Sequence, residues 1–181
     1  FEDASPDVVA YVRYLEVIAG KSANTAFSYY CDLRGFSRFM KRRRGLVPAD
    51  CEMKDIDPKG LDAAFWASVT KEDIYEYLYF LGSECGNKKS STARRLASLH
   101  GFYDYLVNQV NRLDSDPTAA IKPPKQDKVL PKYLTAEQSM DLLESTQTQS
   151  DFPERDYCMV VLFLNCGMRL SELVGMDLDD I

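Results

Sequence analysis

Four prolines with interspersed lysines interrupt the chain between residues 114 and 134. Proline has no amide hydrogen and clashes with the preceding helical turn, so one helix cannot run through this stretch. We therefore predict an extended linker between two helical segments. The prolines are Pro117, Pro123, Pro124 and Pro131, and the predicted parts are residues 1–113, the linker 114–134 and residues 135–181.

The start of the first segment has the spacing of two amphipathic helices. Ser5-Pro6 is typical of a helix start, and this helix is expected to end near Gly20. Asn24 is predicted to cap a longer second helix, which Gly45 closes. The predicted core face of the second helix consists of Phe27, Tyr30 or Cys31, Leu33 or the methylenes of Arg34, Phe36, Phe39 and Met40.

The rest of the first segment is predicted to hold a loop and two more helices. Residues 46–69 are mixed and polar, and we expect a loop with one short helical turn. Thr70-x-x-Asp73 resembles a capping box that opens the third long helix, and Ser90 or Ser91 is predicted to cap the fourth. Apolar residues from Leu96 onward follow a helical period.

Helical spacing resumes after the linker. Thr135-x-x-Gln138 is a second capping box, Pro153 begins a further apolar helix, and Gly167 interrupts it before another short helix. The sequence therefore predicts an all-α protein, with four to five helices before the linker. We expect the segment after the linker to be too short for an ordinary independent core.

The charge of the chain is unevenly distributed. The net charge is −6, but residues 135–181 hold ten acidic and two basic side chains, whereas residues 1–134 carry a net charge of +2. The bases form clusters, and such local clusters determine the field that a phosphate backbone meets. They are Arg34, Arg38, Lys41, Arg42, Arg43 and Arg44; Lys88, Lys89, Arg94 and Arg95; and Lys122, Lys125, Lys128 and Lys132 in the linker.

Other features narrow the class of protein. Five cysteines without a C-x-x-C pair favour reduced thiols and a cytoplasmic location over disulfides or zinc. His100, the single histidine, is predicted to belong to a packed helix face. No apolar run is long enough to cross a membrane, and the acidic first residues lack the basic-then-apolar layout of a signal peptide. Since the chain lacks an initiator Met, we expect that Phe1 is not the natural start.

The residues alone show no complete catalytic constellation, but one helix start is suited to phosphate. Lys88, Lys89, Ser90, Ser91 and Thr92, followed by Arg94 and Arg95, bring amide N–H groups and cations together. The alternative is a solvated helix start. For Arg42 and Arg43 the alternative is stronger, since cations at a helix end also favour the helix dipole.

Several segments in order resemble the tyrosine site-specific recombinases of the Xer and phage-integrase family. The last of these segments is similar to the family's motif around its first active-site arginine. The segments are residues 24–33 (NTAFSYYCDL), 92–106 (TARRLASLHGFYDYL), the linker from Asp116-Pro117-Thr118 to Leu134-Thr135, and 166–173 (CGMRLSEL).

This resemblance implies a SAM-like core-binding domain over residues 1–113, followed by the linker and the start of a catalytic domain at 135–181. It implies an enzyme that cuts and rejoins double-stranded DNA through a 3′-phosphotyrosyl intermediate, without a metal or cofactor. Arg169 then corresponds to a catalytic arginine, and we interpret Glu172 as its orienting partner. The 181 residues contain no H-x-x-R motif and no matching nucleophilic tyrosine, so we expect them to bind DNA without cleaving it.

The resemblance also implies partners and DNA contacts. Thr25 and Tyr29 match positions that face DNA, although packing and helix-start roles are alternatives for them. The family acts as a tetramer of subunits on two duplexes, without a membrane or a small-molecule substrate. Two other classes stay open from the residues: a stand-alone helical DNA-binding or adaptor module, and a helical protein-interaction domain.

Overall fold

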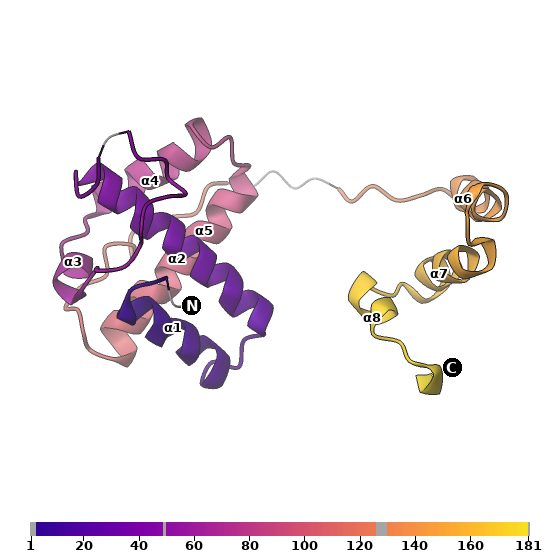
Figure 1. Ribbon diagram of the computed structural model, residues 1–181, viewed down its shortest axis with the longest axis horizontal. Helices are drawn as coiled ribbons and strands as arrows, with labels where there is room; N and C mark the ends of the chain where they lie inside the picture. The colour runs from indigo at the N-terminus through magenta and orange to yellow at the C-terminus, as the bar shows by residue number, and fades with distance from the viewer. Residues whose placement is uncertain (1–2, 49, 126–129, 181) are drawn as a thin grey trace. The chain divides into compact units, whose positions relative to one another are not determined.

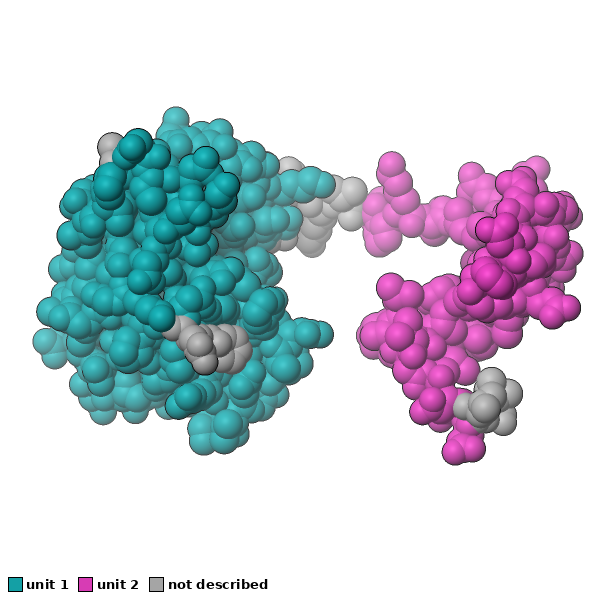
Figure 2. Space-filling view, viewed as in Figure 1, with its two compact units in different colours: residues 1–127 teal, residues 128–181 magenta. Residues whose placement is uncertain are grey.

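The computed structural model describes residues 3–48, 50–125 and 130–180, and within these ranges it contains eight α-helices and no strand. The predicted all-α fold is therefore confirmed. The chain divides into two compact units, Phe1–Asp127 and Lys128–Ile181, which Figure 2 shows in different colours. Lys128, counted above among the linker lysines, lies outside the described residues.

In the first unit α2 is the central helix, and it packs against α1, α4 and α5 (Figure 1). A π-helical turn, η1, continues α5 at its C-terminal end. The elements are α1 (Pro6–Val17), α2 (Ala23–Arg43), α3 (Ala63–Ala67), α4 (Lys71–Ser83), α5 (Lys89–Asp104) and η1 (Tyr105–Gln109).

Local signals located the helices, although two of the predicted caps are wrong. Ser22, not Asn24, caps α2, because its Oγ accepts the Thr25 N–H at 3.3 Å. The N-cap of α5 is Lys88, so Ser90 and Ser91 lie inside the first turn. Lys88 occupies the N-cap position because its backbone is extended, with ψ 152°, and its side chain makes no capping hydrogen bond.

The capping box that opens α4 is confirmed. Thr70 Oγ1 accepts the Asp73 N–H at 3.3 Å, and Asp73 Oδ2 accepts the Thr70 N–H at 3.0 Å. Two of the N–H groups that a helix start leaves without intrahelical partners are thereby satisfied.

The predicted core face of α2 is largely confirmed, since Tyr30, Leu33, Phe36 and Met40 are buried. Phe27 is an exception, because 56% of it is exposed. Its neighbour Ala26, fully buried, occupies the inward position of that turn, while the Phe27 ring lies outside against Tyr30 with centroids 6.1 Å apart.

The segment between α2 and α4 contributes to the core. Ile56, Leu61 and Trp66 are buried, and the Trp66 ring meets that of Phe102 edge-to-face with centroids 5.0 Å apart. The predicted short helical turn is α3. The sequence of this segment is typical of a polar loop, but the segment packs onto the helices through a few large buried side chains.

The beginning of the predicted linker packs onto the first unit. Thr118 and Ile121 are buried, and His100 on α5 contacts both residues. His100 Nδ1 lies 2.8 Å from Thr118 Oγ1, and Nε2 lies 3.2 Å from the carbonyl oxygen of Ile121. His100 thus belongs to a packed face, as predicted, and the packed part of the first unit extends to Ile121.

The second unit consists of helices that bury little of their apolar surface. Helix α6 packs against α7, and Gly167, in the left-handed conformation with φ 63°, ends α7. Thr135 and Gln138 form the predicted capping box at the start of α6. No apolar side chain of α6, α7 or α8 is fully buried. The elements are α6 (Ala136–Gln149), α7 (Pro153–Cys166), α8 (Leu170–Val174) and a 3-10 turn, η2 (Leu178–Asp180).

Among the described residues, no helix combines the length and the apolar character needed to span a membrane.

One close helix contact permits a stability test. A Cβ added at Gly101 on α5 would lie 2.3 Å from the hydroxyl oxygen of buried Tyr11, whereas a Cβ at Gly82 on α4 meets nothing within 4 Å. We expect Gly101→Ala to lower the free energy of unfolding by about 1–3 kcal/mol through overpacking. Gly82→Ala is the control and should stabilise by about 0.5–1 kcal/mol. Equal midpoints for the two variants in urea unfolding would contradict the close approach.

Candidate nucleic-acid interface

The predicted phosphate-binding residues at the start of α5 differ in exposure. Lys88, Lys89 and Ser90 are exposed, and Ser91 is half-buried. Thr92 is buried, and its hydroxyl donates to the Lys88 carbonyl oxygen at 3.4 Å. The structure therefore presents the cations and the first serine to solvent, while the Thr92 hydroxyl is used within its own helix.

Arg94 and Arg95, one turn further along α5, converge on a buried carboxylate of α2. Asp32 is 5% exposed and accepts hydrogen bonds from Arg94 Nη1 at 2.5 Å and Nη2 at 2.9 Å. Ser98 Oγ donates to Asp32 at 2.8 Å, and Arg95 Nε lies 3.7 Å from it. Both carboxylate oxygens of Asp32 are therefore occupied by donors from α5.

Thr25 and Tyr29 lie on α2, toward the other end of α5. Tyr29 Cε2 would be 3.8 Å from a Cβ at Gly101, whereas Asp32 meets Arg94 and Ser98. Moving toward the N-terminus of α2 thus means moving toward the C-terminus of α5, so the two helices run in opposite directions here. The predicted DNA contacts, from Lys88 at the start of α5 to Tyr29 beside Gly101, therefore span about 20 Å along α5, because an α-helix rises 1.5 Å per residue.

The basic cluster at residues 34–44, at the end of α2 and its C-cap and here called the α2 basic segment, is largely engaged inside the first unit. Arg34 pairs with Asp3 at 3.0 Å. Arg38 Nε and Lys41 Nζ donate to the carbonyl oxygens of Ile56 and Asp57, at 2.9 and 2.8 Å. These contacts hold neighbouring chain segments in place, and the Asp3 carboxylate offsets the charge of Arg34, so the positive field is smaller than the count of bases suggests.

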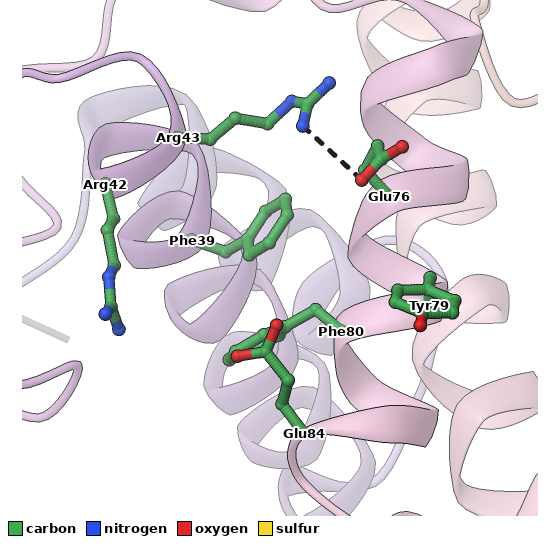
Figure 3. Close-up of a pocket in the computed structure, with 7 residues that line it drawn as sticks. All are labelled: Phe39, Arg42, Arg43, Glu76, Tyr79, Phe80 and Glu84. Carbon is green, nitrogen blue, oxygen red and sulfur yellow. Dashed lines mark ion pairs between the residues drawn. The ribbon is translucent and has the colours of Figure 1, made fainter.

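Arg42 and Arg43 point to different sides of the same turn (Figure 3). Arg43 pairs with Asp73 at 3.0 Å and with Glu76 at 3.6 Å. Arg42 is exposed and has no ion pair among the described residues. Both line an open pocket of about 420 Å³ between α2 and α4, with Phe39, Tyr79, Phe80 and Glu84. Both arginines are exposed, and of the two predicted contacts Arg42 is the one without an ion pair in the described part of the chain.

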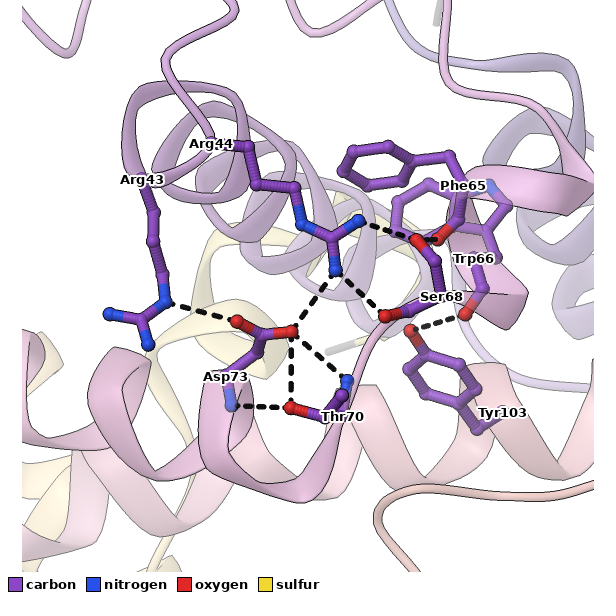
Figure 4. Close-up of polar contacts among 8 residues, drawn as sticks. All are labelled: Arg43, Arg44, Phe65, Trp66, Ser68, Thr70, Asp73 and Tyr103. Carbon is purple, nitrogen blue, oxygen red and sulfur yellow. Dashed lines mark hydrogen bonds and ion pairs between the residues drawn. The ribbon is translucent and has the colours of Figure 1, made fainter.

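Asp73 connects the end of α2 to the start of α4 (Figure 4). It accepts from Arg43 Nε at 3.0 Å, Arg44 Nη2 at 3.1 Å and the Thr70 N–H. Burial alone would raise the pKa of the Asp73 carboxyl, but the Thr70 N–H and the two arginines outweigh burial and lower it. Asp73 is therefore held in its charged form.

Arg169 lies in the second unit and is 83% exposed at its side chain. Glu172 accepts the main-chain N–H of Arg169 at 2.7 Å and its Nη1 at 3.1 Å. The predicted proximity of the two side chains is therefore present. The two hydrogen bonds that Arg169 donates to this carboxylate orient the arginine at the start of α8 and leave other N–H groups of its guanidinium free to bind an anion.

Sequence reasoning missed the importance of Asp32 and Asp73. Each is an acid on the inward side of an amphipathic helix, next to residues such as Leu33 and Ile74 that are buried. A carboxylate in that position must be paired, because burial of an unpaired charge is costly. An acid on the inward side of an amphipathic helix is therefore a sequence signal for a buried ion pair, although it does not identify the basic partner.

Comparison with known proteins finds similarity to one family. The phage integrase family profile matches residues 132–181. Tyrosine recombinase XerC of Caldanaerobacter subterraneus is 40% identical over 176 residues, covering 97% of this chain and 49% of that protein. Tyrosine recombinase XerD of Halalkalibacterium halodurans is 33% identical over 180 residues, covering 99% and 54%.

A crystal structure titled XerA recombinase aligns with a TM-score of 0.42 and 22% identity, over 97% of this chain and 51% of that chain. The chain spans about half the length of the curated relatives that it matches.

Proposed function

Because this chain belongs to the Xer-type tyrosine recombinases, we propose that it is the DNA-binding portion of a site-specific recombinase. The whole enzyme would cut and rejoin DNA through a 3′-phosphotyrosyl intermediate. In this proposal residues 1–113 form the core-binding domain, 114–134 the linker, and 135–181 the start of the catalytic domain. The partners are double-stranded DNA and further subunits in a tetramer, and we place the protein in the cytoplasm.

The exposed cations at the start of α5 are the observation that carries this proposal. Lys88 and Lys89 are exposed, and the Arg94 side chain is 48% exposed although it is paired. Such contacts to phosphate supply affinity without reading sequence. On α2, by contrast, most cations serve internal contacts, so we assign them a smaller part in binding, with Arg42, which has no ion pair among the described residues, as the exception.

We further propose that Arg169 contributes to catalysis in the whole enzyme, with Glu172 as a positioning residue. A guanidinium is planar and can donate paired hydrogen bonds to the non-bridging oxygens of a phosphate. Negative charge builds on those oxygens during transfer, so donors that are already oriented stabilise the transition state. Glu172 supplies that orientation through its hydrogen bonds to Arg169.

The proposal predicts salt-dependent DNA binding by the 181-residue chain. The logarithm of the association constant for a duplex should fall linearly with the logarithm of salt concentration, because phosphate contacts release counterions. Lys88→Ala combined with Lys89→Ala should weaken binding on every sequence and reduce the salt slope by about 2. Fluorescence anisotropy with two unrelated duplexes across a salt series measures both quantities.

The control variant is Arg13→Ala combined with Lys21→Ala, which removes two exposed cations from the region of α1. It should bind close to wild type. A flat salt dependence of the wild-type chain would instead favour a protein-interaction domain and reject the proposal.

The same mixtures should contain no cleaved DNA, and a cleaved product from this chain would overturn the assignment of the chain as binding portion alone.

A further inference from the structure

We propose that Asp32 is a positioning residue that holds Arg94 and Arg95 ready for phosphate. This inference rests on the proposed DNA-binding function and deepens it. Asp32 is itself too buried to touch DNA, since its side chain is 5% exposed. It acts through the two arginines, which are 48% and 31% exposed at their side chains.

The contacts around Asp32 come from one stretch of α5. Arg94 donates to both carboxylate oxygens, Ser98 donates to Oδ2, and Arg95 Nε lies 3.7 Å from Oδ1. The carboxylate is on α2, 62 positions earlier in the sequence than Arg94. Paired bonds to a planar guanidinium fix its orientation as well as its position. Asp32 therefore sets the direction of the Arg94 side chain.

Both arginines keep donors for a second anion. A guanidinium has five N–H groups, and Asp32 uses two of those on Arg94. Arg95 also bonds the Tyr77 hydroxyl of α4, and because its Nε is buried, the donors that it can offer a phosphate are on its terminal nitrogens. Two cations gather around one carboxylate, so the cluster retains a net charge of +1 and can attract a phosphate.

Positioning and simple electrostatics predict opposite results for removing the Asp32 charge. Asn has nearly the same shape as Asp, so Asp32→Asn makes the surface more positive by one charge. Electrostatics alone then predicts tighter DNA binding. If Asp32 positions the arginines, both side chains gain freedom in the variant, and ordering each of them on DNA costs free energy. Binding then weakens.

The test compares Asp32→Asn with Asp3→Asn in the 181-residue chain. The control makes the same change of charge at the partly exposed Arg34–Asp3 pair. We expect Asp32→Asn to bind a duplex about ten-fold more weakly than wild type, as two long side chains lose their fixed geometry. Asp3→Asn should bind as tightly as wild type or more tightly. Affinities are measured well below the melting temperature of each variant, so that a merely structural role would leave them unchanged.

A second variant covers the case in which Asp32→Asn does not fold. Ser98 is fully buried and donates to Asp32, so Ser98→Ala loosens the carboxylate without touching DNA or changing charge. It should weaken binding about two- to three-fold. In nitrogen NMR, the guanidinium rotation of Arg94 should be slow in wild type and faster in the folded variants.

The outcomes separate the two proposals. Wild-type binding that depends on salt, together with weaker binding by Asp32→Asn or Ser98→Ala and not by Asp3→Asn, supports the inference. Unchanged or tighter binding by the folded variants overturns the inference and leaves the proposed function standing. Absence of salt-dependent binding by the wild-type chain overturns the proposed function and this inference with it.

Discussion

Replacing Trp66 by alanine should lower the free energy of unfolding of the first unit by about 3–5 kcal/mol. Trp66 is fully buried, and its ring contacts those of Phe36, Phe65 and Phe102, with centroids 5.0–6.5 Å apart. It anchors the segment between α2 and α4, so its loss leaves a cavity and frees that segment from α5 as well.

Trp66→Phe is the matched control for this prediction. The indole Nε1 is buried and has no hydrogen-bond partner among the described residues, so phenylalanine removes no polar contact. It keeps most of the buried aromatic surface and should destabilise much less than alanine. Because Trp66 is the single tryptophan, unfolding in urea is followed by circular dichroism instead of fluorescence. Equal midpoints for wild type and Trp66→Ala would contradict the packing described here.

Asp73→Ala should destabilise the first unit by about 2–4 kcal/mol, somewhat below the loss from breaking a fully buried pair because both arginines are partly exposed. The change removes half of the capping box of α4 and leaves Arg43 and Arg44 without their shared carboxylate. Denaturant unfolding measures the loss. Asp156→Asn in the second unit, a partly exposed acid paired with Arg155, is the control and should change the stability of the first unit little.

The pH dependence of stability should follow from the same carboxylate. Because the pKa of Asp73 is lower in the folded than in the unfolded chain, its stabilisation is fully present above the unfolded pKa. This stabilisation is lost as pH falls through the lowered pKa that Asp73 has in the folded chain. The free energy of unfolding of the wild-type chain should therefore decrease in acid. Asp73→Asn should lose less stability over the same acid range. Parallel curves of unfolding free energy against pH for the two proteins would show that Asp73 is not held charged by these partners.

Much of the fold could be predicted because its signals are local. The Thr70–Asp73 and Thr135–Gln138 pairs are three residues apart, and a helix start requires donors and acceptors at that spacing. Gly167 ends α7 because a left-handed residue suits glycine. The cap of α2 was predicted wrongly, since Ser22 and Asn24 are both good capping residues and the entering backbone selects between them.

The candidate site was predictable only in part. The cluster from Lys88 to Arg95 was identified as a basic helix start, and the exposure of Lys88 and Lys89 agrees with that interpretation. For Arg42 and Arg43 in the α2 basic segment, phosphate contact was the less favoured interpretation, and in the structure Arg43 and Arg44 hold Asp73. A count of charges cannot show which bases are already paired.

The sequence by itself determined the all-helical class, the position of the linker prolines, most helix boundaries and the family. Each of these depends on residues within a few positions of one another, or on motifs read in order. Only the tertiary structure decided which cations face solvent. The Arg94–Asp32 and Arg43–Asp73 pairs join residues 62 and 30 positions apart, and no spacing rule relates them. Burial makes such pairing necessary, but the packing of α2 against α4 and α5 determines which partner each carboxylate finds.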